Sequence, residues 1–178
     1  MRVFGIDPGS QRTGFGCVES DGRRHRLVIC GAIRVPAGAP FAVRLSAIYR
    51  ELTTHLRDAS PDVVAIENLF HATNVRSALT LGHARGVAML AAVEAGMPVV
   101  EYTPAEIKRA VVGYGRAEKP QVQQMVKVIL GLPAVPSPHD AADALAVAIC
   151  HLHSAPRHAV AAPAAPRRKA TSWRTYRP

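Results

Sequence analysis

One uninterrupted apolar run constrains the fold of this chain more than any other feature. In Asp62-Val63-Val64-Ala65-Ile66-Glu67, four apolar residues stand in succession between two acids, directly after the break at Ser60-Pro61. Such unbroken runs are typical of strands in parallel sheets, where helices cover both faces. The run therefore predicts a buried parallel strand in a sheet with helices on both sides.

The segments before this run predict a small antiparallel sheet. Turn signals at Asp7-Pro8-Gly9 and Gly22 separate three segments rich in apolar residues, which indicates a meander of three strands over residues 3–6, 13–19 and 26–35. Apolar residues then recur every three or four positions over residues 41–56, and this spacing predicts a helix.

The segments after the run alternate between helix and strand. Asn74 is expected to cap a long helix that ends near Ala95, and a further strand follows at residues 99–102. Three more helices are predicted, from Thr103-Pro104, over residues 119–130, and from Ser137 to about Leu152. We expect an α/β domain: a mixed five-stranded sheet flanked by helices, with the first and fourth strands adjacent near its centre.

Charge is distributed unevenly along the 178 residues, a length that suits one domain. Lys and Arg number 22 against 13 Asp and Glu, and the segment 153–178 holds no acid but six bases: Arg157, Arg167, Arg168, Lys169, Arg174 and Arg177. We expect a domain over residues 1–152 and a flexible Pro/Ala/Arg-rich tail over 153–178. The basic balance favours an anionic polymer partner, most simply nucleic acid, over a tail that only aids solubility.

Several classes of protein are disfavoured by the same sequence. No stretch of 18 apolar residues is free of charge, and Asp7 interrupts the N-terminal segment too early for a secretory signal. The three cysteines, Cys17, Cys30 and Cys150, are isolated and odd in number, which argues against a disulfide framework or a zinc site. We expect a cytoplasmic protein without membrane contact.

Four acids occupy positions where a carboxylate is unfavourable. Asp7 follows an apolar strand, Glu67 ends the apolar run, and Asp140 and Asp143 share one face of a helix that continues with apolar residues. Carboxylates in such places cost free energy unless a cation compensates them. Mg²⁺ binds to a few carboxylates together with phosphate oxygens, and two such ions about 3.5–4 Å apart stabilise the attacking and leaving oxygens of a phosphodiester.

Each acid also has an ordinary structural explanation. Asp7 before Pro-Gly can be a turn former, Glu67 can end a strand in water, and Asp140 approximates a capping box with Ser137. Asp143 is the hardest to explain in this way, because its helix is otherwise apolar. Residue types and spacing by themselves leave a metal site and separate structural roles both open.

Blocks of sequence in a fixed order resemble one enzyme family. They are Gly5-Ile6-Asp7-Pro8-Gly9-Ser10-x-x-Thr13-Gly14, Ile66-Glu67-x-x-Phe70, Ser77-Ala78-Leu79-x-Leu81-Gly82-x-Ala84-Arg85-Gly86-Val87-Ala88, Val111-Val112-Gly113, Ala117-Glu118-Lys119-x-Gln121-Val122, and Asp140-Ala141-Ala142-Asp143-Ala144-Leu145-Ala146. From Met1 to about Leu152 the chain resembles the RuvC family, bacterial crossover-junction endodeoxyribonucleases that resolve Holliday junctions. The resemblance implies a ribonuclease-H-like fold and a role in homologous recombination and DNA repair.

The resemblance also implies a cofactor, a substrate and partners. The expected enzyme is a homodimer that nicks a four-way DNA junction symmetrically on two strands of like polarity and leaves 5′-phosphates. Nicking is expected to need Mg²⁺ or Mn²⁺, with two ions per active site. The RuvA-RuvB branch-migration complex is the implied protein partner.

Site residues follow from matching positions in the resemblance. The metal-binding catalytic carboxylates are expected to be Asp7, Glu67, Asp140 and Asp143, with a contribution from the neighbouring His139 left open. Lys108 and Lys119 match catalytic lysines near the scissile phosphate, where they also contact DNA. The other expected DNA contacts are Phe70, which matches an aromatic residue that stacks on junction bases, and Arg76 and Arg85, which are candidate phosphate contacts.

Two further features bear on the match to the family. Thr73 stands where some relatives are expected to carry a basic residue, so a DNA contact there is in doubt, and His71 or Arg76 is a possible substitute. Ala78, Gly82 and Gly86, continued by Leu90, form a line of small residues along the long helix. This line packs either against the protein's own sheet or, as the resemblance favours, against a second copy.

Three other functions compete with a junction nuclease. A ribonuclease-H-like enzyme acting on structured RNA would share the Asp7 motif, but the blocks around Phe70 and Ala78–Arg85 argue against it. A non-catalytic junction-binding module is disfavoured by the complete set of four carboxylates. An actin-like ATPase is disfavoured because 178 residues are too few for its two domains.

Overall fold

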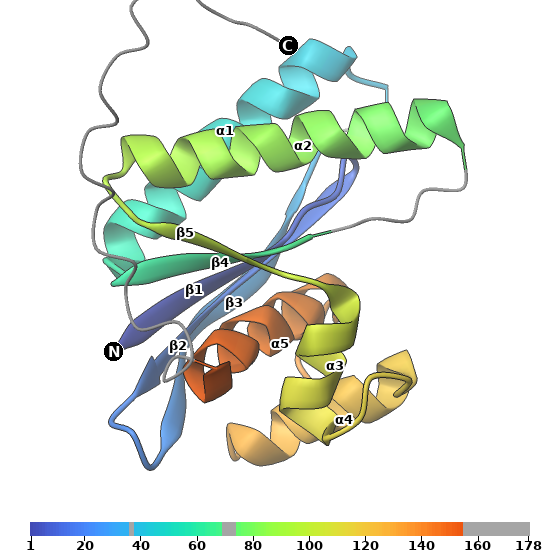
Figure 1. Ribbon diagram of the computed structural model, residues 1–178. Coiled ribbons are helices and arrows are strands. Elements are labelled where there is room, and N and C mark those ends of the chain that lie inside the picture. The colour runs from blue at the N-terminus through green and yellow to red at the C-terminus, as the bar shows by residue number, and fades with distance from the viewer. Residues whose placement is uncertain (36–37, 69–73, 155–178) are drawn as a thin grey trace, which may run out of the picture.

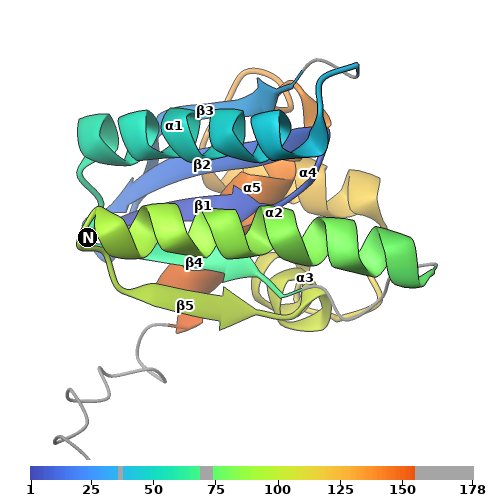
Figure 2. The same cartoon turned by 90° about the horizontal axis from the view of Figure 1, so that it is seen from above.

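The computed structural model describes residues 1–35, 38–68 and 74–154, and these form three layers (Figure 1). The middle layer is a five-stranded sheet, which consists of β1 (Arg2–Asp7), β2 (Arg12–Ser20), β3 (His25–Arg34), β4 (Val63–Glu67) and β5 (Val99–Tyr102). The helices are α1 (Phe41–Ala59), α2 (Val75–Glu94), α3 (Pro104–Val112), α4 (Lys119–Ile129) and α5 (His139–Ser154). Helices α1 and α2 cover one face of the sheet, and α3, α4 and α5 cover the other (Figures 1 and 2).

The order of the strands confirms the predicted topology. The order is β3-β2-β1-β4-β5, with β1, β2 and β3 antiparallel in succession and β4 and β5 parallel to their neighbours. The mixed sheet, its opening meander and the central β1–β4 pair are therefore as expected. Helix α5 runs two residues past the predicted end at Leu152, and the remaining tail, residues 155–178, lies outside the described residues.

The apolar run in β4 is buried on both faces of the sheet, as its composition predicts. Val64 and Ile66 pack with α1 and α2 on one side, in a core that also holds Phe4 and Ile6 of β1. Val63 and Ala65 pack in the core of the opposite face, beneath α5. Successive residues of a strand point to opposite faces, so an unbroken apolar run contributes to both cores.

The helix starts agree with their capping residues in two cases and differ in one. Asn74 accepts a hydrogen bond from the Ser77 amide at 2.9 Å and caps α2. Thr103 and Glu106 form a reciprocal capping box at the start of α3. Helix α5 begins at His139, so Ser137 lies one residue too early to act as its N-cap. Ser137 and Asp140 therefore do not form the capping box that would explain Asp140 as a structural residue.

Helix α5 crosses the sheet unusually closely, and glycines in β1 and β2 make this possible. A Cβ atom at Gly5 would lie 2.0 Å from the Ala144 carbonyl oxygen, and one at Gly14 would lie 2.0 Å from the Asp140 carbonyl oxygen. Gly14 is the register partner of Asp7 in the β1–β2 ladder. The missing side chain at Gly14 thus lets the first turn of α5 approach the end of β1, where Asp7 stands.

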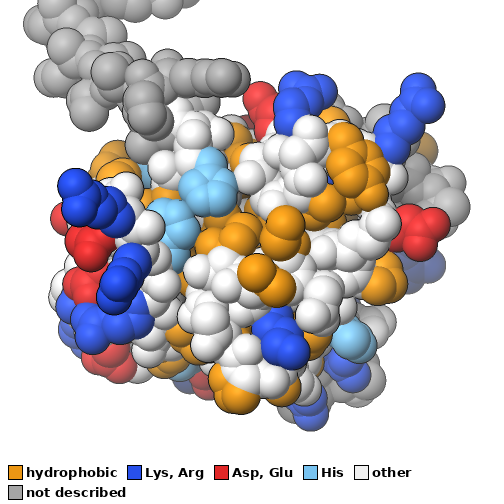
Figure 3. Space-filling model, turned by 90° about the horizontal axis from the view of Figure 1, so that it is seen from below, with side chains coloured by type: hydrophobic (Ala, Val, Ile, Leu, Met, Phe, Trp, Pro, Cys, Tyr) orange, Lys and Arg blue, Asp and Glu red, His pale blue; other side chains and the backbone are white. Residues whose placement is uncertain are grey.

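The described residues show the length of the helices, the state of the cysteines and the distribution of surface charge. Among the helices of the described residues, none has both the length and the apolar character needed to cross a bilayer. Cys17, Cys30 and Cys150 are free thiols. On the face seen from below the sheet, Lys and Arg side chains form several separate groups with uncharged surface between them (Figure 3).

Candidate active site

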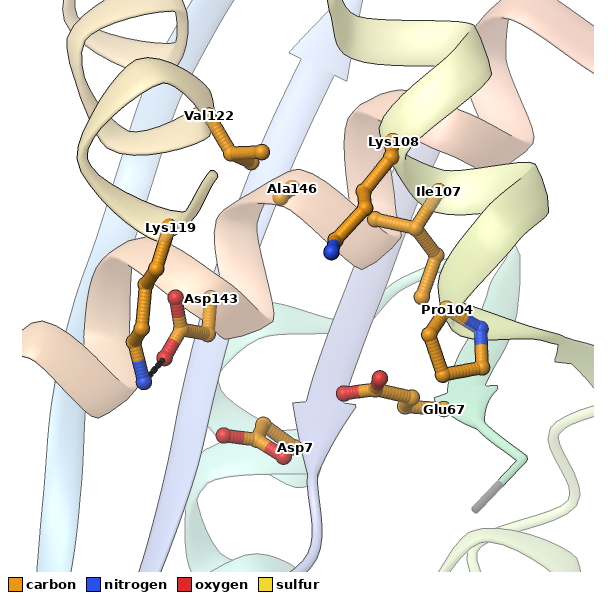
Figure 4. Close-up of a pocket in the computed structure, with 9 residues that line it drawn as sticks. All are labelled: Asp7, Glu67, Pro104, Ile107, Lys108, Lys119, Val122, Asp143 and Ala146. Carbon is orange, nitrogen blue, oxygen red and sulfur yellow. Dashed lines mark ion pairs between the residues drawn. The ribbon is translucent and has the colours of Figure 1, made fainter. Parts of the chain in front are cut away.

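A cavity of about 390 Å³ opens where β1 and β4 end, and three of the four predicted carboxylates line it. Figure 4 shows its lining residues: Asp7, Glu67, Pro104, Ile107, Lys108, Lys119, Val122, Asp143 and Ala146. The cavity lies between the sheet edge and helices α3, α4 and α5. Ligands of open α/β sheets bind in this kind of crevice, outside the carboxyl ends of the strands.

The strand register brings Asp7 and Glu67 together. Ile6 and Ile66 are partners in the parallel β1–β4 ladder, and each is followed by the acid that ends its strand. Asp143 reaches the same cavity from α5, which crosses close above these strands. Acids separated by up to 136 positions in the sequence thus converge on one site.

Burial and mutual repulsion raise the pKa of two of these acids. The pKa of Asp7 is raised well above 3.8, first by burial and then by the negative charges of Glu67 and Asp143. The pKa of Glu67 is also raised by burial, although a hydrogen bond with Asp7 acts in the opposite direction. The folded protein therefore holds negative charge here at a cost in free energy.

Two side chains from α4 hold the third acid. Lys119 Nζ lies 2.5 Å from Asp143 Oδ2, and Gln123 Nε2 donates to Asp143 Oδ1 at 3.3 Å. Burial alone lowers the pKa of Lys119, but the pairing with Asp143 and the nearby charge of Asp7 outweigh it and raise the pKa. Lys119 therefore remains an ammonium ion and partly compensates the cluster.

Lys108, Asp140 and His139 differ in their positions relative to the cavity. The Lys108 ammonium points into the cavity from α3, and its charge lowers the pKa of Glu67 (Figure 4). Asp140 does not line the cavity, but its charge contributes to the raised pKa of Asp7. The ring of His139 contacts Gln123, with 3.0 Å between His139 Nδ1 and Gln123 Oε1.

The acids do not form a closed ligand cage in this structure. Within the described residues, no three His, Cys, Asp or Glu side chains stand close enough together to hold a metal ion. The like charges of Asp7, Glu67 and Asp143 repel one another, and Lys119 and Gln123 occupy both oxygens of Asp143. The carboxylates share one cavity without converging on one point.

The predicted DNA contacts on and before α2 have separate environments. Phe70, His71 and Thr73 lie outside the described residues. Arg76 is exposed in the first turn of α2, whereas Arg85 forms an ion pair with Glu101 of β5 at 2.5 Å. The guanidinium of Arg85 thus links α2 to the sheet edge, and its contact with DNA stays a prediction.

The sequence did not single out Gln123, although the structure places it at the site. Its side chain is only 6% exposed and joins Asp143 to His139. The available signal was its position four residues after Lys119, which puts both side chains on one helix face. Gln121 and Gln124 offer similar chemistry nearby, so spacing from an established lysine would have been needed to choose between them.

Comparisons with known proteins place this chain in a family. Residues 3–151 match the family described as crossover junction endodeoxyribonuclease RuvC. A protein of that name from Koribacter versatilis is 57% identical over 155 residues, which cover 86% of this chain and 93% of the relative. The structure of Thermus thermophilus RuvC in complex with a Holliday junction substrate is 37% identical, with a TM-score of 0.83 over 87% of this chain and 94% of that one.

A more distant structure extends the likeness of fold. The yeast mitochondrial Holliday junction resolvase is 14% identical, with a TM-score of 0.62 over 85% of this chain and 77% of that one. At this identity the likeness concerns the fold alone, and the ribonuclease-H-like architecture expected from the sequence is confirmed. On the match over residues 3–151 and the high identity to its relatives, this chain belongs to the RuvC family of crossover junction endodeoxyribonucleases.

Proposed function

We propose that this protein resolves Holliday junctions by metal-dependent, paired nicking of two DNA strands. The observation that carries the proposal is the cavity in which Asp7, Glu67 and Asp143 meet two lysines at the ends of β1 and β4. Acids supply ligands for a divalent cation, and lysines supply charge for a phosphate. A relative 37% identical has been captured with a Holliday junction, which supports the same substrate for this chain.

The residues present fit a hard divalent cation such as Mg²⁺ or Mn²⁺. Among the side chains that line the cavity, those of Asp7, Glu67 and Asp143 offer carboxylate oxygens as ligands. A bound cation would stabilise the ionised forms of Asp7 and Glu67, which burial disfavours. We assign Asp7, Glu67, Asp140 and Asp143 as the ligands of two ions. When bound, such ions activate water and stabilise the attacking and leaving oxygens of a phosphodiester.

The two lysine side chains in the cavity have a role different from that of the metal ligands. Lys108 and Lys119 enter the cavity from α3 and α4, on either side of Asp143 (Figure 4). An ammonium group there attracts the scissile phosphate and stabilises the charge that develops on it. We further assign Phe70, Arg76 and Arg85 to contacts with the junction, and the basic segment 153–178 to salt-sensitive DNA affinity outside the nuclease domain.

A comparison of substrates tests the proposed function. The purified protein with Mg²⁺ is incubated with a four-way DNA junction, a linear duplex of the same sequence and a structured RNA. We expect nicking of the junction alone. Equal nicking of the linear duplex would remove the junction specificity, and cleavage of the RNA alone would favour the ribonuclease alternative.

The stability of the metal-free protein is expected to fall as pH rises. Because the pKa of Asp7 is higher in the folded than in the unfolded state, the folded protein binds more protons between these two values, and the free energy of unfolding decreases as pH increases from about 4. Mg²⁺ at about ten times its Kd should restore about 1.4 kcal/mol, which is about 3–6 °C in Tm.

Differential scanning calorimetry at pH 5 to 8, with and without Mg²⁺, measures both effects. Asp7→Asn is the matched variant, because it removes the titrating group and leaves all others in place. Parallel pH dependence in the wild type and Asp7→Asn, or the same response of both to Mg²⁺, would contradict the assignment of Asp7.

We also propose a homodimer that forms through the exposed face of α2. The buried residues of α2 are Ala84, Ala88, Ala91 and Ala92, whereas the line from Ala78 through Gly82 and Gly86 is exposed on the other side of the helix. This line runs along a shallow apolar groove, which is also lined by Leu79 and Leu90, and these two side chains are 59% and 50% exposed. An apolar groove with small residues at its centre suits close approach of a second α2.

Bulky residues in this line should break the dimer without harming the monomer. A Cβ atom at Gly82 or Gly86 would meet nothing within 4 Å. We therefore expect Gly82→Leu/Gly86→Leu to fold normally, but to weaken dimerisation by at least about 100-fold, or about 2.8 kcal/mol. Sedimentation equilibrium measures this, with Thr54→Leu on the exposed side of α1 as control. A wild-type monomer at micromolar concentration would refute the proposed dimer.

The family also suggests where and with what the enzyme works. We propose that it acts in the cytoplasm, where the chromosome lies, and that it cooperates with the RuvA-RuvB branch-migration complex. A stimulation of junction nicking when that complex is added tests the partnership.

A further inference from the structure

Gln123 is a buried polar side chain at the active site that has no part in the proposed cleavage. Its amide has partners at both ends: Nε2 donates to Asp143 Oδ1 at 3.3 Å, and Oε1 lies 3.0 Å from His139 Nδ1. The side chain is only 6% exposed. Burying an amide is costly unless it is hydrogen-bonded, so these two contacts fix the position of the group.

Asp143 is held by α4 through both of its oxygens. Lys119 pairs with Oδ2, and Gln123, one helical turn further along, donates to Oδ1. The carboxylate plane is therefore set by two side chains that sit on the same face of one helix. Such outer contacts orient the ligands of metal sites, and their loss typically costs 10–100-fold in metal affinity or activity.

The direction of the Gln123 amide follows from chemistry. An ionised carboxylate only accepts hydrogen bonds, so the NH₂ group of Gln123 must face Asp143 and the carbonyl oxygen must face His139. A carbonyl oxygen in turn needs a donor, so His139 must carry its proton on Nδ1. In the neutral ring, Nε2 then holds the lone pair.

We propose that Gln123 is a positioning residue that orients Asp143 for metal binding and holds His139 in the Nδ1–H tautomer. Only the kinetic consequence of this proposal rests on the proposed nuclease function. The tautomer itself is a property of the metal-free protein without DNA.

The tautomer is measured by NMR on the full chain labelled with ¹⁵N-histidine. Two-bond ¹H–¹⁵N correlations, recorded under alkaline conditions in which the imidazoles are neutral, distinguish the two neutral forms. His139→Gln identifies the signal of His139 among the eight histidines. We expect the Nδ1–H form in the wild type, and loss of this preference in Gln123→Met. A wild-type His139 in the Nε2–H form overturns the proposal without any variant of Gln123.

The Mg²⁺ dependence of nicking measures the effect on Asp143. Gln123→Met keeps the length of the side chain but removes both hydrogen bonds, and Gln124→Met makes the same change at an exposed position on the same helix. We expect Gln123→Met to raise the Mg²⁺ concentration for half-maximal nicking 10–100-fold, with junction affinity unchanged. Gln124→Met should match the wild type.

The two readouts separate the failure of this proposal from that of the nuclease function. A wild-type protein that does not nick would refute the function, while the tautomer would still test the role of Gln123. Equal Mg²⁺ dependence of Gln123→Met and Gln124→Met in an active enzyme would refute the orientation of Asp143 by Gln123.

Discussion

Asp7→Asn is expected to reduce the nicking of a four-way junction by at least about 10³-fold while the protein becomes more stable. Asn has the same shape as Asp but no charge, so it removes one anionic ligand of the proposed metal site. A loss of about 4 kcal/mol of transition-state stabilisation corresponds to this fall in rate. Stability rises because the buried carboxylate, whose pKa is raised, no longer has to be held ionised at neutral pH.

This combination of opposite effects distinguishes an active-site acid from a structural one. Single-turnover nicking measures the rate, a mobility shift without divalent metal measures junction binding, and calorimetry measures Tm. Binding should stay within a few-fold of the wild type. Asp58→Asn, in an exposed position on α1, is the control and should change none of the three. Retention of more than a tenth of the activity by Asp7→Asn would contradict the assignment.

Gly14→Ala is expected to cause a large loss of stability although it adds a single methyl group. Its Cβ would lie 2.0 Å from the Asp140 carbonyl oxygen and 2.6 Å from the carbonyl carbon, and these backbone atoms belong to α5. The helix must therefore shift away from β2. Overpacking of this kind costs about 3 kcal/mol, which lowers Tm by about 6–12 °C in a protein of this size.

The shift of α5 should also impair catalysis in the fraction that stays folded. Asp140 and Asp143 belong to this helix and move with it. A displacement of about 1 Å at a catalytic group can lower the rate about 10²-fold. Calorimetry and nicking at a temperature well below Tm measure the two effects. Gly38→Ala, where an added Cβ meets nothing within 4 Å, is the control. An unchanged Tm for Gly14→Ala would contradict the close crossing of α5.

The sequence predicts those features that depend on local pattern. The unbroken apolar run of β4 identifies a strand buried on both faces, and from it follows the layered α/β fold. The caps at Asn74 and Thr103 fix two helix starts, because a side-chain acceptor satisfies an amide three residues further on. Asp7 and Glu67 are found together because both follow parallel strands.

Features that depend on packing between distant segments could not be predicted in this way. Helix α5 lies close to β1 and β2 because Gly5 and Gly14 have no side chain to keep the helix backbone away. The local sequence of the strands does not indicate which helix will pack on these glycines. The contacts of Lys119 and Gln123 with Asp143 depend on the angle at which α4 and α5 pack. Resemblance to a family located Lys119, but Gln123 became visible only through its contacts.

The most direct test of the central claim is a map of the nicks that the wild-type protein makes in an end-labelled four-way junction with Mg²⁺. We expect paired nicks at symmetric positions in two strands of like polarity, with 5′-phosphate ends that a ligase can reseal, and no nicks in the absence of divalent metal. Stable binding of the junction without nicking, in Mn²⁺ as well as Mg²⁺, would contradict it and would make the protein a junction-binding module.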